Sequence, residues 1–345
     1  MAAQRRAAET GRHGLLAAIA AEAGVSAATV SKVVHRRPDV GAATRARVEE
    51  LLTRHGFVRP GERPPDAPRQ IAVVFRDLLS PYTLEVARGI TDAADDLGAT
   101  VLLGTTGRRS ISRWLAECET AGADGLIVVI SMLSAEDRRR SAEQGLPVVL
   151  VDPLGEPPPG VPGIGVTDER GARQAVEHLL DLGHRRIAVV AGRSHSLAGA
   201  ARLRGYRAAL EGAAVAYDPA LVRATDFDHA EALAAARSLL RSAAPPTAVF
   251  ATSDVQALGV LEAARLEGRR VPDDLSVVSF DDTPAASTAS PPLSAVRQPF
   301  ERIGRAAVQT VLDLADGRPT APGRIELPTE LVLRASTAPA GGASG

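Results

Sequence analysis

Apolar residues are spaced differently in the first sixty residues of this chain than in the remainder. Between residues 15 and 55 they recur at intervals of three and four, which predicts short helices over 15–23, 26–34 and 42–55. Residues 59–69 are rich in proline and contain no apolar run, so they are predicted to be a linker. Beyond Gln70, short apolar runs alternate with longer amphipathic stretches, and a second kind of fold is expected there.

The alternation beyond Gln70 predicts a parallel α/β fold, because strands buried on both faces are joined by helices. Strands are expected at 71–75, 100–104, 125–130, 147–151, 186–191, 221–224, 247–251 and 275–280. Helices are expected at 82–98, 112–121, 135–144, 169–182, 200–212, 230–242, 255–267 and 300–316, before a final run at 325–333. The series restarts after the proline-rich break at 157–160, which indicates two similar lobes with chain crossings near 162, 292 and 322.

Residues 24–34 have the pattern of a helix-turn-helix. Gly24 suits the turn because glycine tolerates a positive φ, and Ser26 is a favoured N-cap for the helix that follows. Val30 and Val33 are expected to face inward, toward Ile19. The other side chains of the second helix are small enough to enter a DNA major groove.

The predicted fold class is therefore an N-terminal all-α helix-turn-helix domain joined to a two-lobed α/β domain. We expect the first domain at 15–58, the linker at 59–69 and the second domain at 70–336, with flexible tails at 1–14 and 337–345. Two lobes joined by several crossings predict a cleft, with a ligand bound beyond the carboxyl ends of the strands.

Charge is distributed unevenly between the two predicted domains. The chain has a net charge of −1, but its first sixty residues contain ten basic and five acidic residues, so the head is +5 and the remainder −6. A basic head on an acidic body is typical of a module that binds nucleic-acid phosphates. Lys32, in the second predicted helix, is the only lysine of the chain.

Several classes of protein are disfavoured by composition. The single cysteine, Cys118, excludes an internal disulfide framework and a cysteine-based metal site. No apolar run reaches the roughly 18 residues of a membrane span, and residues 1–14 lack the apolar core of a secretory signal. We expect a cytoplasmic protein without cofactor, metal or membrane partner.

The chain resembles the LacI/GalR family of bacterial transcription regulators over roughly residues 15–336. In the head, the resemblance rests on residues 20–26, 29–34 and 44–48. In the body it rests on 80–82, 182–187, 202–206, 250–254, 257–259, 277–282 and 291–299, in that order. It implies a type I periplasmic-binding-protein fold and a homodimer on a pseudo-palindromic operator, with a small, sugar-like effector between the lobes and no enzymatic activity.

The resemblance places seven residues at the effector: Ser80, Tyr82, Asp152, Arg202, Phe227, Ser253 and Asp281. Arg202 and Asp281 match positions that hydrogen-bond sugar hydroxyls. Charged side chains suit this role because charge-assisted hydrogen bonds are strong. Phe227 matches an aromatic residue that lies against the ligand. The residues alone also allow Arg202 and Asp281 to form a structural ion pair, and Phe227 to be a core side chain.

The residues expected at the DNA surface are Ser26, Ala27, Ala28, Thr29, Ser31, Lys32 and His35. Ala27 and Ala28 can contact a thymine methyl group but donate no side-chain hydrogen bond, whereas Lys32 is expected on a phosphate. The family usually continues into a hinge helix whose leucine enters the minor groove. Residues 57–68 contain no leucine here, and their prolines oppose a helix.

Alternative functions are also open. A solute-binding protein would share the two-lobed body, but the basic head would have no role in it. An enzyme of the glycosidase type would use Asp152 and Asp281 as paired acids, although no phosphate loop, nucleophile triad or metal cluster supports catalysis. Within the regulators, a nucleoside or purine is the alternative to a sugar as effector.

Overall fold

The computed structural model describes residues 15–34, 40–55, 57, 68–107, 109–192, 196–320 and 323–341. The chain divides into two units, one of Met1–Ala67 with Thr120–Gly122 and one of Pro68–Glu119 with Ala123–Gly345. The division at residue 67 falls within the predicted linker, of which only Pro68 and Arg69 are described. Each unit is considered by itself below.

The N-terminal unit is built from the helix Leu15–Ala23, α2 (Ala27–Val34) and α3 (Ala42–Arg54). The first two helices meet at 106°, and Gly24 between them has a φ of +66°. The Ser26 hydroxyl accepts a hydrogen bond from the Thr29 backbone N–H at 3.1 Å, which confirms the predicted cap. Val30 and Val33 are fully buried in the cluster that contains Ile19, as predicted.

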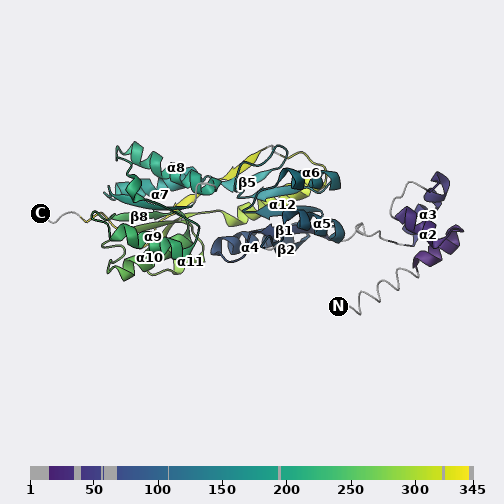
Figure 1. The fold of residues 1–345 in the computed structure, drawn as a ribbon, viewed down its shortest axis with the longest axis horizontal. Coiled ribbons are helices and arrows are strands. Elements are labelled where there is room, and N and C mark those ends of the chain that lie inside the picture. Colours follow the sequence, from purple (N-terminus) through teal and green to yellow (C-terminus); the bar gives the residue numbers. More distant parts are fainter. Residues whose placement is uncertain are drawn as a thin grey trace. The chain divides into compact units, whose positions relative to one another are not determined.

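The C-terminal unit contains two six-stranded sheets (Figure 1). In spatial order, the first is β11 (Arg324–Leu327), β5 (Gly163–Val166), β4 (Val148–Val151), β3 (Gly125–Val129), β1 (Arg69–Phe75) and β2 (Ala99–Thr105), all parallel. The second is β12 (Glu330–Val332), β10 (Ser294–Arg297), β9 (Ser276–Asp281), β8 (Ala248–Ala251), β6 (Ile187–Gly192) and β7 (Val222–Thr225), with β12 alone antiparallel to its neighbour.

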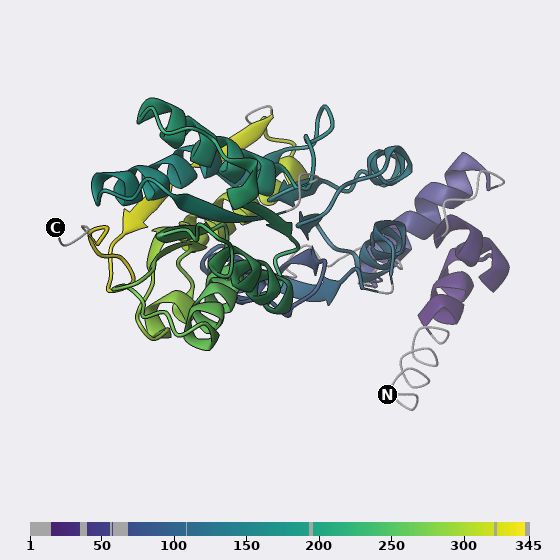
Figure 2. The same cartoon turned by 60° about the vertical axis from the view of Figure 1, so that its left-hand side comes forward.

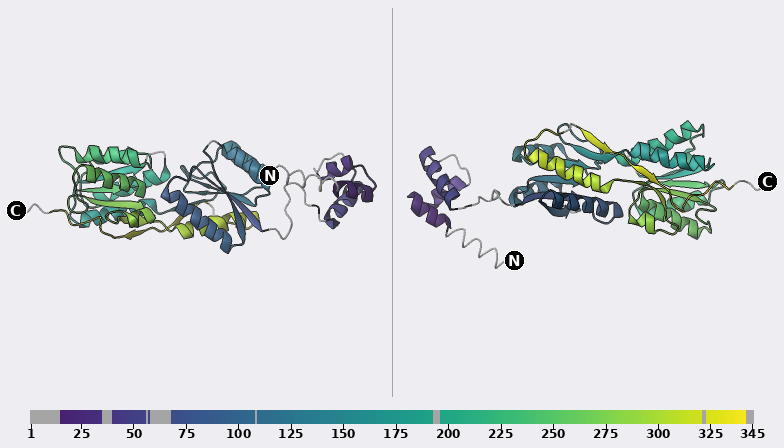
Figure 3. Two further views of the ribbon diagram at one scale, coloured as in Figure 1. Left: turned by 90° about the horizontal axis from the view of Figure 1, so that it is seen from below. Right: turned by 180° about the vertical axis from the view of Figure 1, so that it is seen from behind.

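Helices cover both faces of each sheet and so define two lobes (Figures 1 and 3). The first lobe has α4 (Pro81–Asp96), α5 (Ile111–Ala121), α6 (Ala135–Gln144) and α12 (Phe300–Ala315). The second has α7 (Asp168–Asp181), α8 (Leu197–Gly212), η1 (Pro219–Leu221), α9 (His229–Leu240), α10 (Asp254–Leu266) and α11 (Pro284–Thr288). Strands β3, β4, β6, β8 and β9 are buried along their whole length, as expected for parallel sheets covered on both sides.

The chain crosses between the lobes three times. It crosses at Thr167 between β5 and α7, at Gln298–Pro299 between β10 and α12, and at 328–329 between β11 and β12. Each crossing lies a few residues beyond the positions 162, 292 and 322 expected from the sequence. The difference arises because the short strands β5 and β10 continue the first and second sheets before the chain leaves them, and the run at 325–333 is divided between both sheets.

The expectation of a flexible tail from residue 337 is wrong for residues 337–341. The Ala340 backbone N–H donates to the Leu182 carbonyl at 2.8 Å, and His184 Nε2 lies 3.0 Å from the Ala338 carbonyl oxygen. The Thr337 hydroxyl is 3.1 Å from His178 Nε2. These polar contacts hold the end of the described chain on the second lobe (Figure 2).

Candidate functional sites

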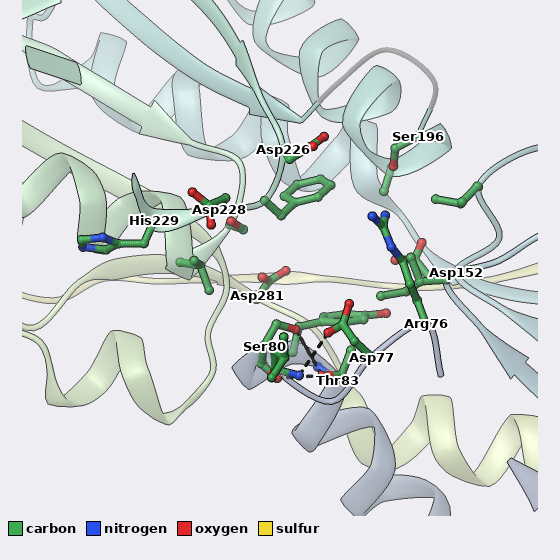
Figure 4. A pocket seen from close by; sticks show the side chains of 18 of the residues that line it. Arg76, Asp77, Ser80, Thr83, Asp152, Ser196, Asp226, Asp228, His229 and Asp281 are labelled. Atoms are coloured by element: carbon green, nitrogen blue, oxygen red, sulfur yellow. Dashed lines mark hydrogen bonds between the residues drawn. The ribbon is translucent and has the colours of Figure 1, made fainter. Parts of the chain in front are cut away.

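A pocket of about 530 Å³ lies between the two lobes of the C-terminal unit. Its walls are formed by the segments that follow the carboxyl ends of strands from both sheets, which is where parallel α/β sheets bind ligands. Figure 4 shows Ser80 and Asp77 on one side of this space, and Asp226 and Asp228 on the other. All seven effector residues expected from the sequence line it: Ser80, Tyr82, Asp152, Arg202, Phe227, Ser253 and Asp281.

Arg202, on α8, has a buried guanidinium that both lines the pocket and is held by the protein. Its Nε donates to Asp168 Oδ1 at 2.8 Å, and its Nη1 donates to the Thr252 carbonyl at 2.6 Å. Nη1 also lies 3.4 Å from Asp281 Oδ1. The guanidinium carbon stacks 3.7 Å from the centre of the Phe280 ring. Arg202 therefore forms the ion pair that the residues alone allowed, and it also lines the pocket.

Asp281 ends β9 in a left-handed backbone conformation, with a φ of +110°, and Asp282 follows with a φ of +57°. Such angles cost energy for residues other than glycine, so neighbouring contacts must hold them. The Asp282 carboxylate accepts from Arg297 Nε at 2.7 Å and from Arg334 Nη1 at 2.6 Å. These two arginines fix the turn that places the Asp281 carboxyl group in the pocket.

Burial shifts the protonation of the pocket carboxyl groups. Desolvation raises the pKa of Asp281 to about 8, although the nearby Arg202 guanidinium opposes the shift. Desolvation and the charge of Asp168 raise the pKa of Asp152 to about 6, against the opposing effect of Arg202. Near neutral pH the protonated Asp281 can therefore donate a hydrogen bond while the ionised Asp152 accepts, and a ligand with several hydroxyl groups can use both.

The two pocket serines serve first as helix caps. Ser80 Oγ accepts from the Thr83 backbone N–H at 3.2 Å at the start of α4, and Ser253 Oγ accepts from Gln256 N at 3.2 Å at the start of α10. Phe227 is 40% exposed, so the core reading of this residue is wrong. Its ring lies over Gly192, where a Cβ atom would come within 2.4 Å of it, and the ring offers an apolar face to the pocket.

Sequence reasoning missed other residues of this site. The pocket is also lined by Arg76, Asp77, Thr83, Ser196, Asp226, Asp228, His229 and Glu231. Half of them lie within three residues of the end of β1 or β7, so their position after a strand was the available signal. Two further polar residues, Asp168 and Gln298, do not line the pocket but hold its charged groups.

The expected DNA surface lies on α2 of the N-terminal unit. Ala27, Ala28 and Lys32 are exposed, whereas Thr29 and Ser31 are half-buried. The Ser26 hydroxyl takes part in the helix cap described above, and its oxygen also lies 2.9 Å from Thr29 Oγ1. His35 lies outside the described residues.

Two searches of the described residues bear on other functions. Over that part of the chain, no group of three or more His, Cys, Asp or Glu side chains is arranged to hold a metal ion. No single helix there is long and apolar enough to cross a membrane. The bent pair Leu15–Ala23 and Ala27–Val34 is sufficiently apolar taken together, but it forms the helix-turn-helix described above.

Comparison with known proteins identifies both units. Residues 16–60 match the family model described as "Bacterial regulatory proteins, lacI family", and residues 176–337 match a periplasmic binding protein-like domain. The HTH-type transcriptional regulator CelR of Thermobifida fusca is 35% identical, with 95% of this chain and 99% of CelR covered. The HTH-type transcriptional repressor CytR of Escherichia coli K12 is 32% identical, with coverage of 92% and 95%. These relatives are regulators, not enzymes.

Solved structures agree with these relatives. The chain matches a CelR–cellobiose complex with a TM-score of 0.70 and 35% identity, covering 93% of this chain and 99% of the other. It matches a Lac repressor dimer bound to operator and the anti-inducer ONPF with a TM-score of 0.70 and 29% identity, covering 93% and 98%. Both similarities extend through the DNA-binding and the two-lobed regions.

Proposed function

This chain belongs to the LacI family of bacterial regulatory proteins and is a ligand-responsive, DNA-binding transcriptional regulator, and we propose that it is a homodimeric repressor whose effector is a small sugar. The effector occupies the pocket between the lobes, and the exposed face of α2 contacts a pseudo-palindromic operator. No catalytic role is assigned to Asp152 or Asp281.

The observation that carries this proposal is the composition of the pocket wall. Arg202 and Asp281 come from the second lobe and Tyr82 and Asp152 from the first, so a bound ligand contacts both lobes at once. Charged groups beside an exposed aromatic ring suit a ligand with hydroxyl groups around an apolar ring face. The relative bound to cellobiose supports a sugar as the class of effector.

The mechanism is a shift between two arrangements of the lobes. A ligand that bonds to both lobes favours the arrangement in which both sets of contacts form. In a dimer, this rearrangement changes the spacing of the two helix-turn-helix units and therefore the affinity for the operator. Reciprocity requires that the operator weaken effector binding by the same factor by which effector weakens operator binding.

The experiment that tests this function begins with selection of genomic DNA fragments by the purified full-length protein, followed by sequencing. A palindromic site should be enriched, and cellobiose, other sugars and nucleosides are then tested for release of that DNA. We expect a sugar to release it. If no sequence is enriched, the proposal that the protein binds an operator is contradicted. If a nucleoside alone releases the DNA, the proposal that the effector is a sugar is contradicted.

Two variants make the same experiment specific to the pocket. Arg202→Ala should lose release by the sugar while keeping its operator affinity in the absence of sugar, because the side chain lies in the C-terminal unit. Arg202→Lys keeps the charge but loses the fork geometry, so it should respond weakly. Circular dichroism melting separates loss of response from loss of folding, which removal of a buried ion-pair partner can also cause.

A further inference from the structure

The pocket residue Asp281 is bonded to the second lobe crossing once through its side chain and once through its backbone. Gln298 Nε2 donates to Asp281 Oδ1 at 2.7 Å, and the Gln298 backbone N–H donates to the Asp281 carbonyl at 3.1 Å. Gln298 is 3% exposed and is one of only two residues between the end of β10 and the start of α12. Any rotation of the lobes that changes the backbone at Gln298 therefore acts on Asp281.

The pocket guanidinium of Arg202 is bonded to the first crossing in the same way. Its partner Asp168 is the first residue of α7 and follows the crossing at Thr167. The other oxygen of Asp168 pairs with Arg324 Nη2 at 3.5 Å. Arg324 belongs to the sheet of the first lobe and Arg202 to a helix of the second, so Asp168 joins the lobes through two cations. A Cβ atom at Gly165 would come within 2.5 Å of Arg324 Nη2, so glycine leaves room for this pair.

The third crossing is tied to the first. The Thr329 backbone N–H donates to Thr167 Oγ1 at 3.1 Å, and the two threonine hydroxyls lie 3.1 Å apart. The three crossings are thus connected through polar contacts that include the pocket residues Arg202 and Asp281.

The second crossing also leads back to the pocket through the first lobe. Phe300 begins α12 directly after Gln298–Pro299, and its ring contacts Tyr82 edge-on with the ring centres 5.7 Å apart. Tyr82 lines the pocket from α4. Asp281 and Tyr82 are therefore connected by contacts through Gln298 and the start of α12. A ligand that contacts both residues connects them a second time, through the pocket.

We propose that Asp168 and Gln298 are positioning residues that couple occupancy of the pocket to the angle between the lobes. Neither residue lines the pocket. Each lies at a lobe crossing, and its side chain bonds to a polar pocket residue, Arg202 or Asp281. Because the Arg202 and Asp281 side chains are fixed to the crossings, their positions in the pocket change with the angle between the lobes. A ligand that bonds to both therefore binds some lobe angles more tightly than others. The inference rests on the proposed function, since it concerns regulation at the same pocket.

The first test needs no ligand. Hydrogen–deuterium exchange is measured on the full-length wild type and on the Asp168→Asn and Gln298→Met variants, which keep side-chain volume. We expect Gln298→Met to increase exchange at the distant first crossing, residues 167–171, and Asp168→Asn to increase it at 298–303. A purely local structural role would raise exchange only around the substituted residue, and that outcome would overturn the proposal.

The matched control is Gln256→Met. Gln256 is also fully buried in the second lobe, where its Nε2 donates to Thr225 Oγ1 at 2.8 Å and its Oε1 accepts from Thr252 Oγ1 at 2.9 Å. Unlike Gln298, it bonds to no crossing residue. The same substitution should lower the melting temperature here too, but leave exchange at 167–171 and 298–303 unchanged.

The second test uses cellobiose as the probe, at a concentration that saturates each variant. The measured quantity is the ratio of operator Kd with and without cellobiose, which saturation makes independent of sugar affinity. We expect this ratio to fall about fivefold or more in Asp168→Asn and Gln298→Met, and to stay unchanged in Gln256→Met. An unchanged ratio in all three variants would overturn the proposal. If cellobiose does not affect the wild type, cellobiose is not the effector, and the exchange result alone decides the coupling.

Discussion

Arg202 is surrounded by more negative groups than its own charge can balance. The carboxylates of Asp168, Asp281 and Asp152 all act on it, and Arg324 supplies the only other cation of this network that the described residues show within ion-pair distance of Asp168. Burying an uncompensated carboxylate costs several kcal/mol, so the protein binds a proton instead. Burial is the main cause of the raised pKa values of Asp281 and Asp152, and the imbalance of charge adds to it.

This imbalance predicts how stability depends on pH. The folded protein keeps the Asp281 proton up to about pH 8, whereas the unfolded chain releases it near its ordinary pKa of 3.8. The folded state binds more protons between these values, so the free energy of unfolding should decrease as pH rises through the interval. Asp281→Asn should remove this part of the decrease. The free energy of unfolding is measured by urea denaturation at about pH 5, 7 and 9.

Asp254 provides the control for the pH experiment. It is buried and its pKa is raised to about 6, mainly by desolvation, while it accepts from the Ser279 and Thr283 hydroxyls rather than from an arginine. Asp254→Asn should therefore remove a pH dependence that ends near pH 6. If Asp281→Asn and wild type have parallel profiles between pH 6 and 8, the raised pKa of Asp281 is wrong.

At the same scale, the sequence predicts some functional residues better than others. Asp152, Ser253 and Asp281 each follow a predicted strand, so the topology rule alone places them at the pocket edge. Arg202 lies within a helix, and only the family resemblance singled it out. Gln298 lies in the stretch 291–299 on which the resemblance rests, but neither signal gave it a role, because that role depends on a bond to Asp281 that no local pattern encodes.

Among the elements, the packing of α12 on α4 connects a lobe crossing to the pocket wall. The two helices cross at paired glycines: a Cβ atom at Gly304 would lie 2.0 Å from the Gly89 carbonyl oxygen, and one at Gly89 would lie 2.4 Å from the Phe300 carbonyl oxygen. Backbone atoms cannot move aside as side chains do. The close approach brings Phe300 against Tyr82.

Gly304→Ala should therefore destabilise the C-terminal unit by about 1–3 kcal/mol or more through overpacking, measured by urea denaturation. It should also lower effector affinity, because α4 carries Tyr82. The control is Gly212→Ala at the end of α8, where a Cβ atom meets nothing within 4 Å. That variant should be neutral or slightly more stable, since alanine favours a helix over glycine. Equal stabilities of the two variants would contradict the tight helix crossing.

Element prediction depended on whether the apolar residues of an element formed a continuous, readable pattern. Helices such as α7 and α12 span several turns, and their apolar faces are readable. Strands β5 and β10 have four residues each and only two apolar side chains apiece, and they were missed. The equally short β4 and β8 are apolar throughout, and they were predicted. The misplacement of the first two lobe crossings follows from these two omissions, and that of the third follows from the division of the run at 325–333 between β11 and β12.

At the scale of the whole molecule, the boundary between the basic and the acidic part of the sequence separates the DNA-binding head from the ligand-binding body. The sequence predicted a basic helical head and an acidic two-lobed body, and both units are present with the expected fold. Residues 58–67, which connect the two units in the proposed homodimer, lie outside the described residues. The electrostatic part of DNA binding, however, depends on the head alone.

Lys32 makes that electrostatic part testable. It is exposed near the end of α2, and on a phosphate it would displace about 0.9 counterion per contact, so a dimer without it should show a salt slope smaller by about 1.8. We expect Lys32→Ala to weaken operator binding with this shallower dependence of log K on log salt, measured by fluorescence anisotropy over a range of potassium chloride concentrations. Lys32→Arg, which keeps the charge, should retain the full slope. An unchanged slope in Lys32→Ala, with binding weakened equally at every salt concentration, would instead place Lys32 on a base edge.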